Sequence, residues 1–218
     1  MRMPYSRTMT AASLFALIAA TAGAEAKIYA VDKAHSEVGF QVRHLVSKVR
    51  GRFTDFSGQV EGDLAKPEGA KVEFTIKAAS INTDNEKRDG HLRTPDFFDV
   101  EKFPEISFKS EKVVAKSKDE FEVHGPLTMH GVTKAVVLPV KLTGAGTGPR
   151  GGEMVGLEIT TVLNRKDYGI VWNRVLDTGG AMLGDEVTVA INLEANEAKR
   201  EAAAPAAGAK DAPQPVAK

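Results

Sequence analysis

The 218-residue sequence contains no cysteine. A chain without thiols forms no disulfide, offers no thiolate to a metal ion, and has no atom to which a lipoprotein anchor could be attached. An excess of charge of either sign is also lacking, because 29 lysines and arginines face 29 aspartates and glutamates. Proteins that bind nucleic acid or anionic membranes usually carry clustered basic charge, which this sequence does not show. We therefore expect no nucleic-acid partner and no stable membrane anchor.

Long apolar runs are absent as well. The most apolar segment, residues 11–22, is shorter than the ~20 residues that a membrane-spanning helix needs. Two arginines precede it and Ala24-Glu25-Ala26 follows, which is the pattern of a cleaved secretory signal peptide. We expect cleavage after Ala26, so that residues 1–26 form the signal peptide. Export without cysteine is typical of the bacterial periplasm, because small secreted eukaryotic domains usually depend on disulfides.

Apolar and polar residues alternate along most of the remaining chain, which predicts half-buried β-strands. The pattern is present in residues 38–42, 52–64, 72–76, 106–108, 121–123, 136–142, 157–163 and 187–193. Short turn-forming segments such as His130-Gly131 separate the strands, so neighbouring strands should run antiparallel. We expect an all-β fold, a closed antiparallel barrel of about eight strands, because closure removes exposed edges. A β-sandwich is the competing architecture.

One segment, from Ser80 to Phe108, interrupts the strands. Thr83 to Glu86 has the arrangement of a capping box, which predicts a short helical insert near residues 84–94 that stops before Pro95. Asp89 and Arg93 are spaced to form an ion pair on this helix. The helix either plugs one end of the barrel or forms the polar collar of a ligand cavity, and the two roles are compatible.

The sequence resembles a known family in four segments taken together. They are YAVDKAHSEVGFQVRH, SINTDNEKRDGHLRTPDFFDVEKFPEISFKS, GPLTMHGVTKAVVLPVKL and NRKDYGI followed by GDEVTVAINLEA. In this order, over residues 28–195, they resemble a YceI-type protein. The resemblance implies a lipocalin-like barrel in the periplasm that binds a long isoprenoid or similar amphiphilic lipid in an internal tunnel, without enzymatic activity. The domain would span residues 27–197, followed by a disordered Ala/Pro/Lys-rich tail at 198–218.

An eight-strand barrel has room inside either for close-packed side chains or for one small ligand. For a ligand, the expected apolar wall comprises Phe40, Val42, Phe53, Phe56, Phe74, Ile76, Phe97, Phe98 and Phe108. The expected polar contacts at the mouth are Arg88, His91, Arg165 and Tyr168. Such a site suits an isoprenoid quinone or a prenyl phosphate, since each buried CH₂ gains roughly 0.8 kcal/mol. We expect no other cofactor.

Two other functions are compatible with the residues. A metal-assisted hydrolase would combine His91 with Asp89, Asp96 or Asp99, and would use Ser36, Ser80 or Ser107 as nucleophile. The five histidines lack zinc-type spacing and no G-x-S-x-G motif is present, so neither a metal nor catalysis is expected. Alternatively, a solidly packed barrel would serve as a structural or interaction module of the cell envelope. The leading interpretation is a periplasmic lipid carrier or store, and the sequence leaves open whether two chains form a homodimer.

Overall fold

The computed structural model describes residues 26–63, 66–149, 151–174 and 181–198. The expected signal peptide, apart from Ala26, and the expected tail, apart from Ala198, lie outside the described residues. Within the described ranges, no helix combines the length and the apolar character needed to cross a membrane.

Strands dominate the described residues, as the alternating pattern predicts. The α-helix α1 spans Glu86–Leu92, and the short 3-10 helices are η1 (Lys33–His35), η2 (Ala78–Ser80) and η3 (Arg165–Tyr168). The strands are β1 (Lys27–Val31), β2 (Glu37–His44), β3 (Ser47–Phe53), β4 (Phe56–Asp63), β5 (Lys66–Lys77), β6 (Ile81–Asn82), β7 (Glu105–Lys109), β8 (Lys112–Ala115), β9 (Glu120–Met129), β10 (Val132–Thr147), β11 (Glu153–Asn164) and β12 (Leu183–Glu197).

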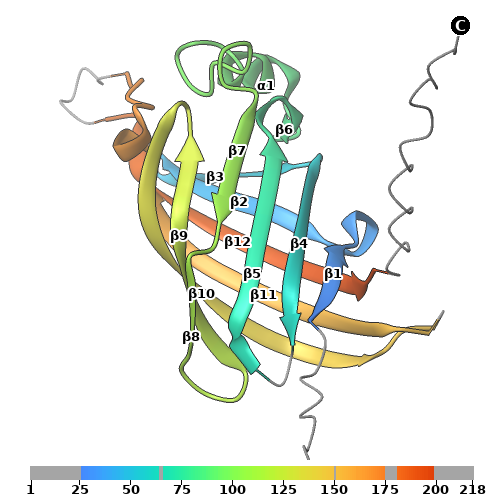
Figure 1. Ribbon diagram of the computed structural model, residues 1–218. Helices are drawn as coiled ribbons and strands as arrows, with labels where there is room; N and C mark the ends of the chain where they lie inside the picture. The colour runs from blue at the N-terminus through green and yellow to red at the C-terminus, as the bar shows by residue number, and fades with distance from the viewer. Residues whose placement is uncertain (1–25, 64–65, 150, 175–180, 199–218) are drawn as a thin grey trace, which may run out of the picture.

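Eight of these strands close into an antiparallel barrel. Their order around it is β1-β4-β5-β7-β9-β10-β11-β12, and the pairing of Val31 with Ala195 helps β12 close the ring onto β1. Figure 1 shows the barrel with α1, in green, over one end. Closure gives the strand edges partners within the ring, which is the physical reason for expecting a barrel. The predicted all-β, lipocalin-like closed barrel with a short helical insert is confirmed.

The strands β2, β3 and β6 extend the sheet at the end that α1 covers. β12 pairs with β2 over Leu183–Asn192 and with β1 over Ala195–Glu197, because η1 bends the chain between β1 and β2. The strand predicted over residues 52–64 is likewise broken at Thr54-Asp55 into β3 and β4. That bend arises because β3 pairs with β2 whereas β4 pairs with β1, a tertiary preference that the local pattern does not reveal.

The helix α1 forms within the predicted segment, but the predicted capping box is wrong. Asn85 caps the helix, since its side-chain oxygen accepts a hydrogen bond from Arg88 N at 3.0 Å. Thr83 lies two residues earlier and instead binds the buried Asp89, which accepts hydrogen bonds from both the hydroxyl and the backbone N–H of Thr83. The predicted ion pair with Asp89 is also wrong, because Arg93 donates to the carbonyls of Ala79 and Ile81. Both interactions fasten α1 to the segment of residues 79–83, which precedes it.

Candidate functional site

The barrel is not filled by its side chains. A cavity of about 480 Å³, here called the upper chamber, lies beneath α1. Its wall is apolar because the inward positions of neighbouring strands are hydrophobic, and it includes Phe40, Val42, Phe53, Leu163, Val187 and Val189. An apolar chamber of this size is typical of small-molecule binding sites.

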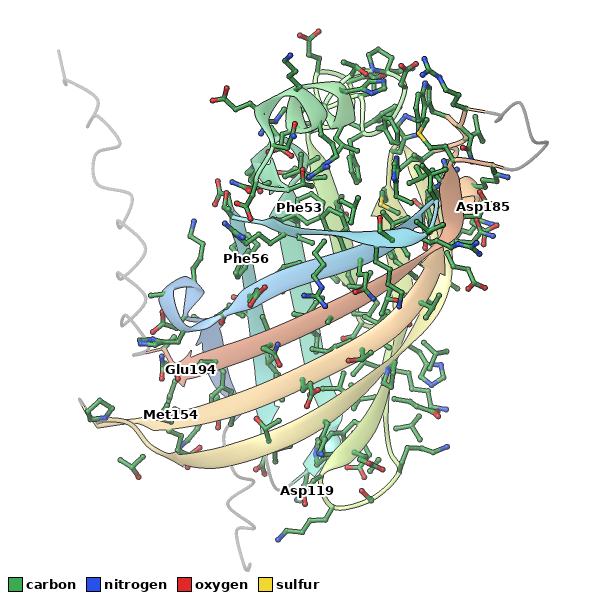
Figure 2. The ribbon with its side chains drawn as sticks, turned by 180° about the vertical axis from the view of Figure 1, so that it is seen from behind. Phe53, Phe56, Asp119, Met154, Asp185 and Glu194 are labelled. Carbon is green, nitrogen blue, oxygen red and sulfur yellow. The ribbon has the colours of Figure 1, made fainter. Side chains whose placement is uncertain are left out.

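Aromatic rings form much of the chamber's wall and roof. Phe53 contacts both Phe40 and Phe98, with ring centroids 5.7 Å apart in each case. Figure 2 places Phe53 at the helix-covered end of the barrel. The Phe40 ring lies against Gly51, where an added Cβ would come within 2.4 Å of it, so a residue without a side chain is required there. Phe97 and Trp172 also line the chamber, and their ring centroids lie 5.1 Å apart.

The polar groups at the chamber are basic or neutral. Lys87, Arg88 and Arg165 line it, and none of its described lining residues is an aspartate or a glutamate. Arg88 donates from Nε to Thr83 Oγ1 and from Nη2 to the Thr83 carbonyl, both at 2.7 Å. Among the described carboxylates, none forms an ion pair with Lys87 or Arg88. Lys87 and Arg88 therefore place positive charge at the mouth of the chamber that no described carboxylate neutralises through an ion pair.

His91 lies at the same mouth and shares a 2.7 Å hydrogen bond with Asp96. Its ring also meets Phe97 and Trp172 edge-on, with centroids 5.1 and 5.0 Å away. Three other groups of the hydrolase hypothesis are engaged elsewhere. Asp89 binds Thr83. Ser36 donates to the Glu194 carbonyl and Ser80 to the Lys77 carbonyl. The structure thus brings together one histidine and one carboxylate of that hypothesis.

Arg165 is almost fully buried, and its hydrogen bonds hold neighbouring segments of the backbone together. Its guanidinium donates to the carbonyls of Ile170, Trp172 and Gly184 at 2.8 to 2.9 Å, and to Asp185 at 3.1 Å. Burial lowers the pKa of Arg165, an effect that Asp185 opposes. These bonds position Trp172 beside the chamber, so Arg165 holds the wall in addition to lining it.

A second cavity of about 170 Å³, here called the lower chamber, lies toward the other end of the barrel. Its wall includes Phe74, Phe108, Val60, Val140 and Leu193. Near it, the hydroxyl of Tyr29 donates to Glu153 at 2.6 Å, while Lys27 forms ion pairs with Glu153 and Glu197. Burial and the hydrogen bond to Glu153 raise the pKa of Tyr29 above its usual range.

The predicted ligand-binding residues fall into three groups. Those lining the upper chamber are Phe40, Val42, Phe53, Arg88, His91, Phe97, Phe98 and Arg165. Phe74 and Phe108 line the lower chamber. Phe56, Ile76 and Tyr168 line neither; Tyr168 is buried, and its carbonyl is bonded to His130 Nδ1 at 3.0 Å.

Other lining residues were absent from the sequence prediction. They include Lys87, Met129, Leu163, Trp172, Met182 and Val189. The alternation of β11 and β12 marks Leu163 and Val189 as inward, but gives no sign that a cavity lies in front of them. Lys87 could have been found from its position beside Arg88 at the start of the helix.

Known proteins match this chain along nearly the whole barrel. The sequence model of the YceI-like domain matches residues 29–195. A UPF0312 protein of Staphylococcus aureus strain MSSA476 is 42% identical over 168 residues, covering 76% of this chain and 95% of that protein. The crystal structure of a YCEI protein from Campylobacter jejuni is 35% identical, with a TM-score of 0.64 over 77% of this chain and 96% of that one. A polyisoprenoid binding domain from Saccharophagus degradans shares the fold, with a TM-score of 0.60 over 78% of this chain and 98% of that one, at 16% identity.

Proposed function

Because the chain belongs to the YceI-like domain family, we propose that it is a periplasmic lipid-binding protein. In this proposal it carries or stores an isoprenoid-type amphiphile, with the hydrocarbon in the upper chamber and the head group at the mouth beside α1. The observation that carries the proposal is the apolar cavity of about 480 Å³ beneath a basic rim. The related fold of a polyisoprenoid binding domain supports the same ligand class. The periplasmic location rests on the signal-peptide pattern of residues 1–26.

Burial of the hydrocarbon supplies most of the affinity in this proposal. A chain gains roughly 0.8 kcal/mol for each CH₂ removed from water, and part of this gain offsets the lost freedom of the ligand. A flexible isoprenoid needs no directional contacts along its length. The aromatic wall around Phe40, Phe53 and Phe98 provides a suitable apolar surface.

The charges at the mouth favour an anionic head group over a neutral one. Lys87 and Arg88 lie at the chamber with no described carboxylate paired to them. A phosphate bound there would receive charge-assisted hydrogen bonds, which are stronger than those to a neutral carbonyl oxygen. Of the two ligands expected from the sequence, a prenyl phosphate therefore fits better than an isoprenoid quinone.

The two alternative functions receive less support. For the hydrolase hypothesis, the supporting contact is the one between His91 and Asp96, at the rim of an apolar cavity. A solidly packed structural barrel is at odds with the two interior cavities. Binding, with no bond made or broken, is the function that the geometry supports best.

The test is to purify the protein from periplasmic extract and analyse an organic extract by mass spectrometry. A stoichiometric amphiphile should be recovered, and adding a prenyl phosphate to the stripped protein should raise its melting temperature. A neutral quinone of the same chain length should raise it less. Recovery of no lipid, together with no thermal shift for either compound, would refute the proposal.

A further inference from the structure

The hairpin formed by β2 and β3 connects the wall of the upper chamber to the outer surface of the protein. Two of its side chains, His44 and Val49, line the chamber. Its tip is held beside the same chamber, because the backbone N–H of Leu45 donates to the carbonyl of Met182, another lining residue, at 2.9 Å. Figure 2 shows this blue hairpin ending close to Asp185 of β12. A partner that contacts the tip would therefore lie at the edge of the ligand cavity.

The tip of the hairpin is apolar and has an unusual backbone. Leu45 and Val46 form a two-residue turn, since His44 pairs with Ser47. Leu45 has a φ of 54°, a left-handed conformation that is unfavourable for leucine and that hairpin turns normally assign to glycine or asparagine. The Val46 side chain is fully exposed, and Leu45 is 37% exposed. Neither the turn conformation of Leu45 nor the exposure of Val46 favours folding, which indicates a contact with a partner outside the chain.

Basic side chains lie directly behind this apolar tip. Residues 38–54 contain four lysines and arginines and no aspartate or glutamate, so the expectation that basic charge is not clustered is wrong for this hairpin. Arg43 and Lys48 are exposed and lie opposite each other across the two strands, and Arg50 follows on the same outer face of β3. Like charges in such cross-strand positions repel each other. The fourth cation, Arg52, is paired with an aspartate, whereas the other three have no ion-pair partner among the described carboxylates.

We propose that this hairpin docks the protein on a bilayer that contains anionic phospholipids, an inference that rests on the proposed lipid-binding function. Leu45 and Val46 enter the interfacial region of the bilayer, and Arg43, Lys48 and Arg50 bind the phosphates of the head groups. Docking brings the edge of the upper chamber to the membrane, so that a lipid moves between the two with little of its hydrocarbon exposed to water. The contact is reversible, in contrast to a stable anchor.

The charges favour a membrane over a second copy of this chain as the partner. In a symmetric dimer each subunit uses the same patch, so the cations of the two hairpins would face each other. An anionic bilayer instead neutralises them. Each lysine or arginine near such a surface strengthens binding about fivefold. The three unpaired cations together therefore correspond to a factor of about 100 in affinity.

Binding to vesicles tests the proposal. The protein is purified from periplasmic extract, stripped of lipid and sedimented with vesicles of phosphatidylcholine alone or of an equal mixture of phosphatidylcholine and phosphatidylglycerol. It should bind the mixed vesicles about 100-fold more tightly than the neutral ones, and this difference should shrink at high salt. Equal binding to the two kinds of vesicle, or no binding to either, would overturn the proposal.

Two variants test the apolar tip. Val46→Ser should weaken binding to the mixed vesicles about fivefold or more, because a valine side chain no longer enters the bilayer. Its melting temperature should equal that of the wild type, since Val46 is fully exposed in the folded protein. Leu45→Gly should also weaken vesicle binding, although glycine suits the positive φ of this position better than leucine does.

A charge variant tests the cations behind the tip. Replacing Arg43, Lys48 and Arg50 together by glutamine should reduce binding to the mixed vesicles to the level that the wild type shows with neutral ones. The matched control makes the same change of net charge at exposed positions around β8, and should bind like the wild type: Lys112→Gln, Lys116→Gln and Lys118→Gln. Equal losses in the two triple variants would show that net charge, and not the hairpin, determines binding.

A ligand titration separates this inference from the proposed function. A short prenyl monophosphate is added without vesicles, and the fluorescence of Trp172 reports binding, because it is the one tryptophan of the chain and lines the upper chamber. Val46→Ser should bind this ligand as tightly as the wild type does. If it also binds vesicles like the wild type, the docking surface is wrong while lipid binding stands. If the wild type binds vesicles through the hairpin but no prenyl phosphate, the proposed function fails and the docking surface stands.

Light scattering identifies the competing partner. Val46→Ser should leave the oligomeric state unchanged. If this variant instead converts a dimer into a monomer while vesicle binding stays the same, the hairpin is an interface between two copies of the chain, and the membrane proposal is wrong.

Discussion

Lys87 and Arg88 are adjacent in the chain, but they are tied to the fold to different degrees. Arg88 binds Thr83 through Nε and Nη2, and Thr83 in turn binds Asp89, so the arginine is part of the structure that holds α1 in place. Lys87 is exposed and, among the described carboxylates, has none as an ion-pair partner. Its charge can therefore be changed with little effect on folding, which makes it the better residue for testing head-group recognition.

We predict that Lys87→Glu weakens the binding of a three-unit prenyl monophosphate by roughly tenfold at low salt, because an attraction is replaced by a repulsion. The loss should shrink at high salt, since exposed charges are screened. The measurement is a Trp172 fluorescence titration at two ionic strengths. Lys118→Glu is the matched control, because it makes the same change of charge at an exposed position in the turn between β8 and β9. Equal losses in the two variants would contradict a specific role for Lys87.

At the scale of the element, α1 depends on its attachments. A helix of seven residues is too short to be stable alone in water. Asn85 caps its first turn, Asp89 fastens it to Thr83, and Arg93 fastens its end to the carbonyls of Ala79 and Ile81. The helix covers the upper chamber because these bonds attach it to β6 and the short η2 before it.

The Asp89 attachment gives a prediction for stability. Asp89→Ala leaves the buried N–H and hydroxyl of Thr83 without their acceptor, and should lower the free energy of unfolding by roughly 1–3 kcal/mol. Asp89→Asn keeps an acceptor oxygen at the same place and should lose less. Urea denaturation followed by circular dichroism compares the three proteins. The role assigned to Asp89 would be wrong if the asparagine variant were as unstable as the alanine variant.

Some features of the helical insert follow from the local sequence, and its N-terminal cap does not. Its position and its termination before Pro95 followed from local chemistry. Its cap did not, because Thr83 and Asn85 are both good capping residues. The choice depends on Asp89, which becomes buried and takes Thr83 as its partner. A local pattern cannot weigh that tertiary contact against the capping hydrogen bond.

At the scale of the whole molecule, alternation was enough to predict a barrel but not its interior. The pattern predicts that Phe53, Phe56 and Phe74 all point inward, yet Phe53 lines the upper chamber, Phe74 lines the lower chamber and Phe56 is packed in the core. Which inward residues meet depends on the stagger and bending of the strands. The break at Thr54-Asp55 places Phe53 and Phe56 on different strands with different partners. Cavities arise from such three-dimensional relations, and the sequence pattern does not contain them.

The seam that closes the barrel gives a prediction for pH. Tyr29 of β1 donates to Glu153 of β11, beside the ion pair of Lys27 with Glu197 of β12. Burial and this hydrogen bond raise the pKa of Tyr29, so the folded protein keeps the phenolic proton at a pH where the unfolded chain, with an ordinary pKa of about 10, has lost it. The unfolded state then binds fewer protons than the folded state, and the free energy of unfolding falls as the pH rises above about 10.

We therefore expect Tyr29→Phe to reduce the steepness of this alkaline loss of stability, because phenylalanine has no proton to lose. At neutral pH the variant should be less stable than the wild type by about 1 kcal/mol, since Glu153 loses a buried donor while Lys27 remains beside it. Urea unfolding at a series of pH values between 8 and 11 measures both effects. Part of the alkaline loss should remain in the variant, because the pKa values of Lys27 and Tyr168 are raised as well. An unchanged pH dependence in the variant would show that the phenolic proton of Tyr29 does not contribute to closing the barrel.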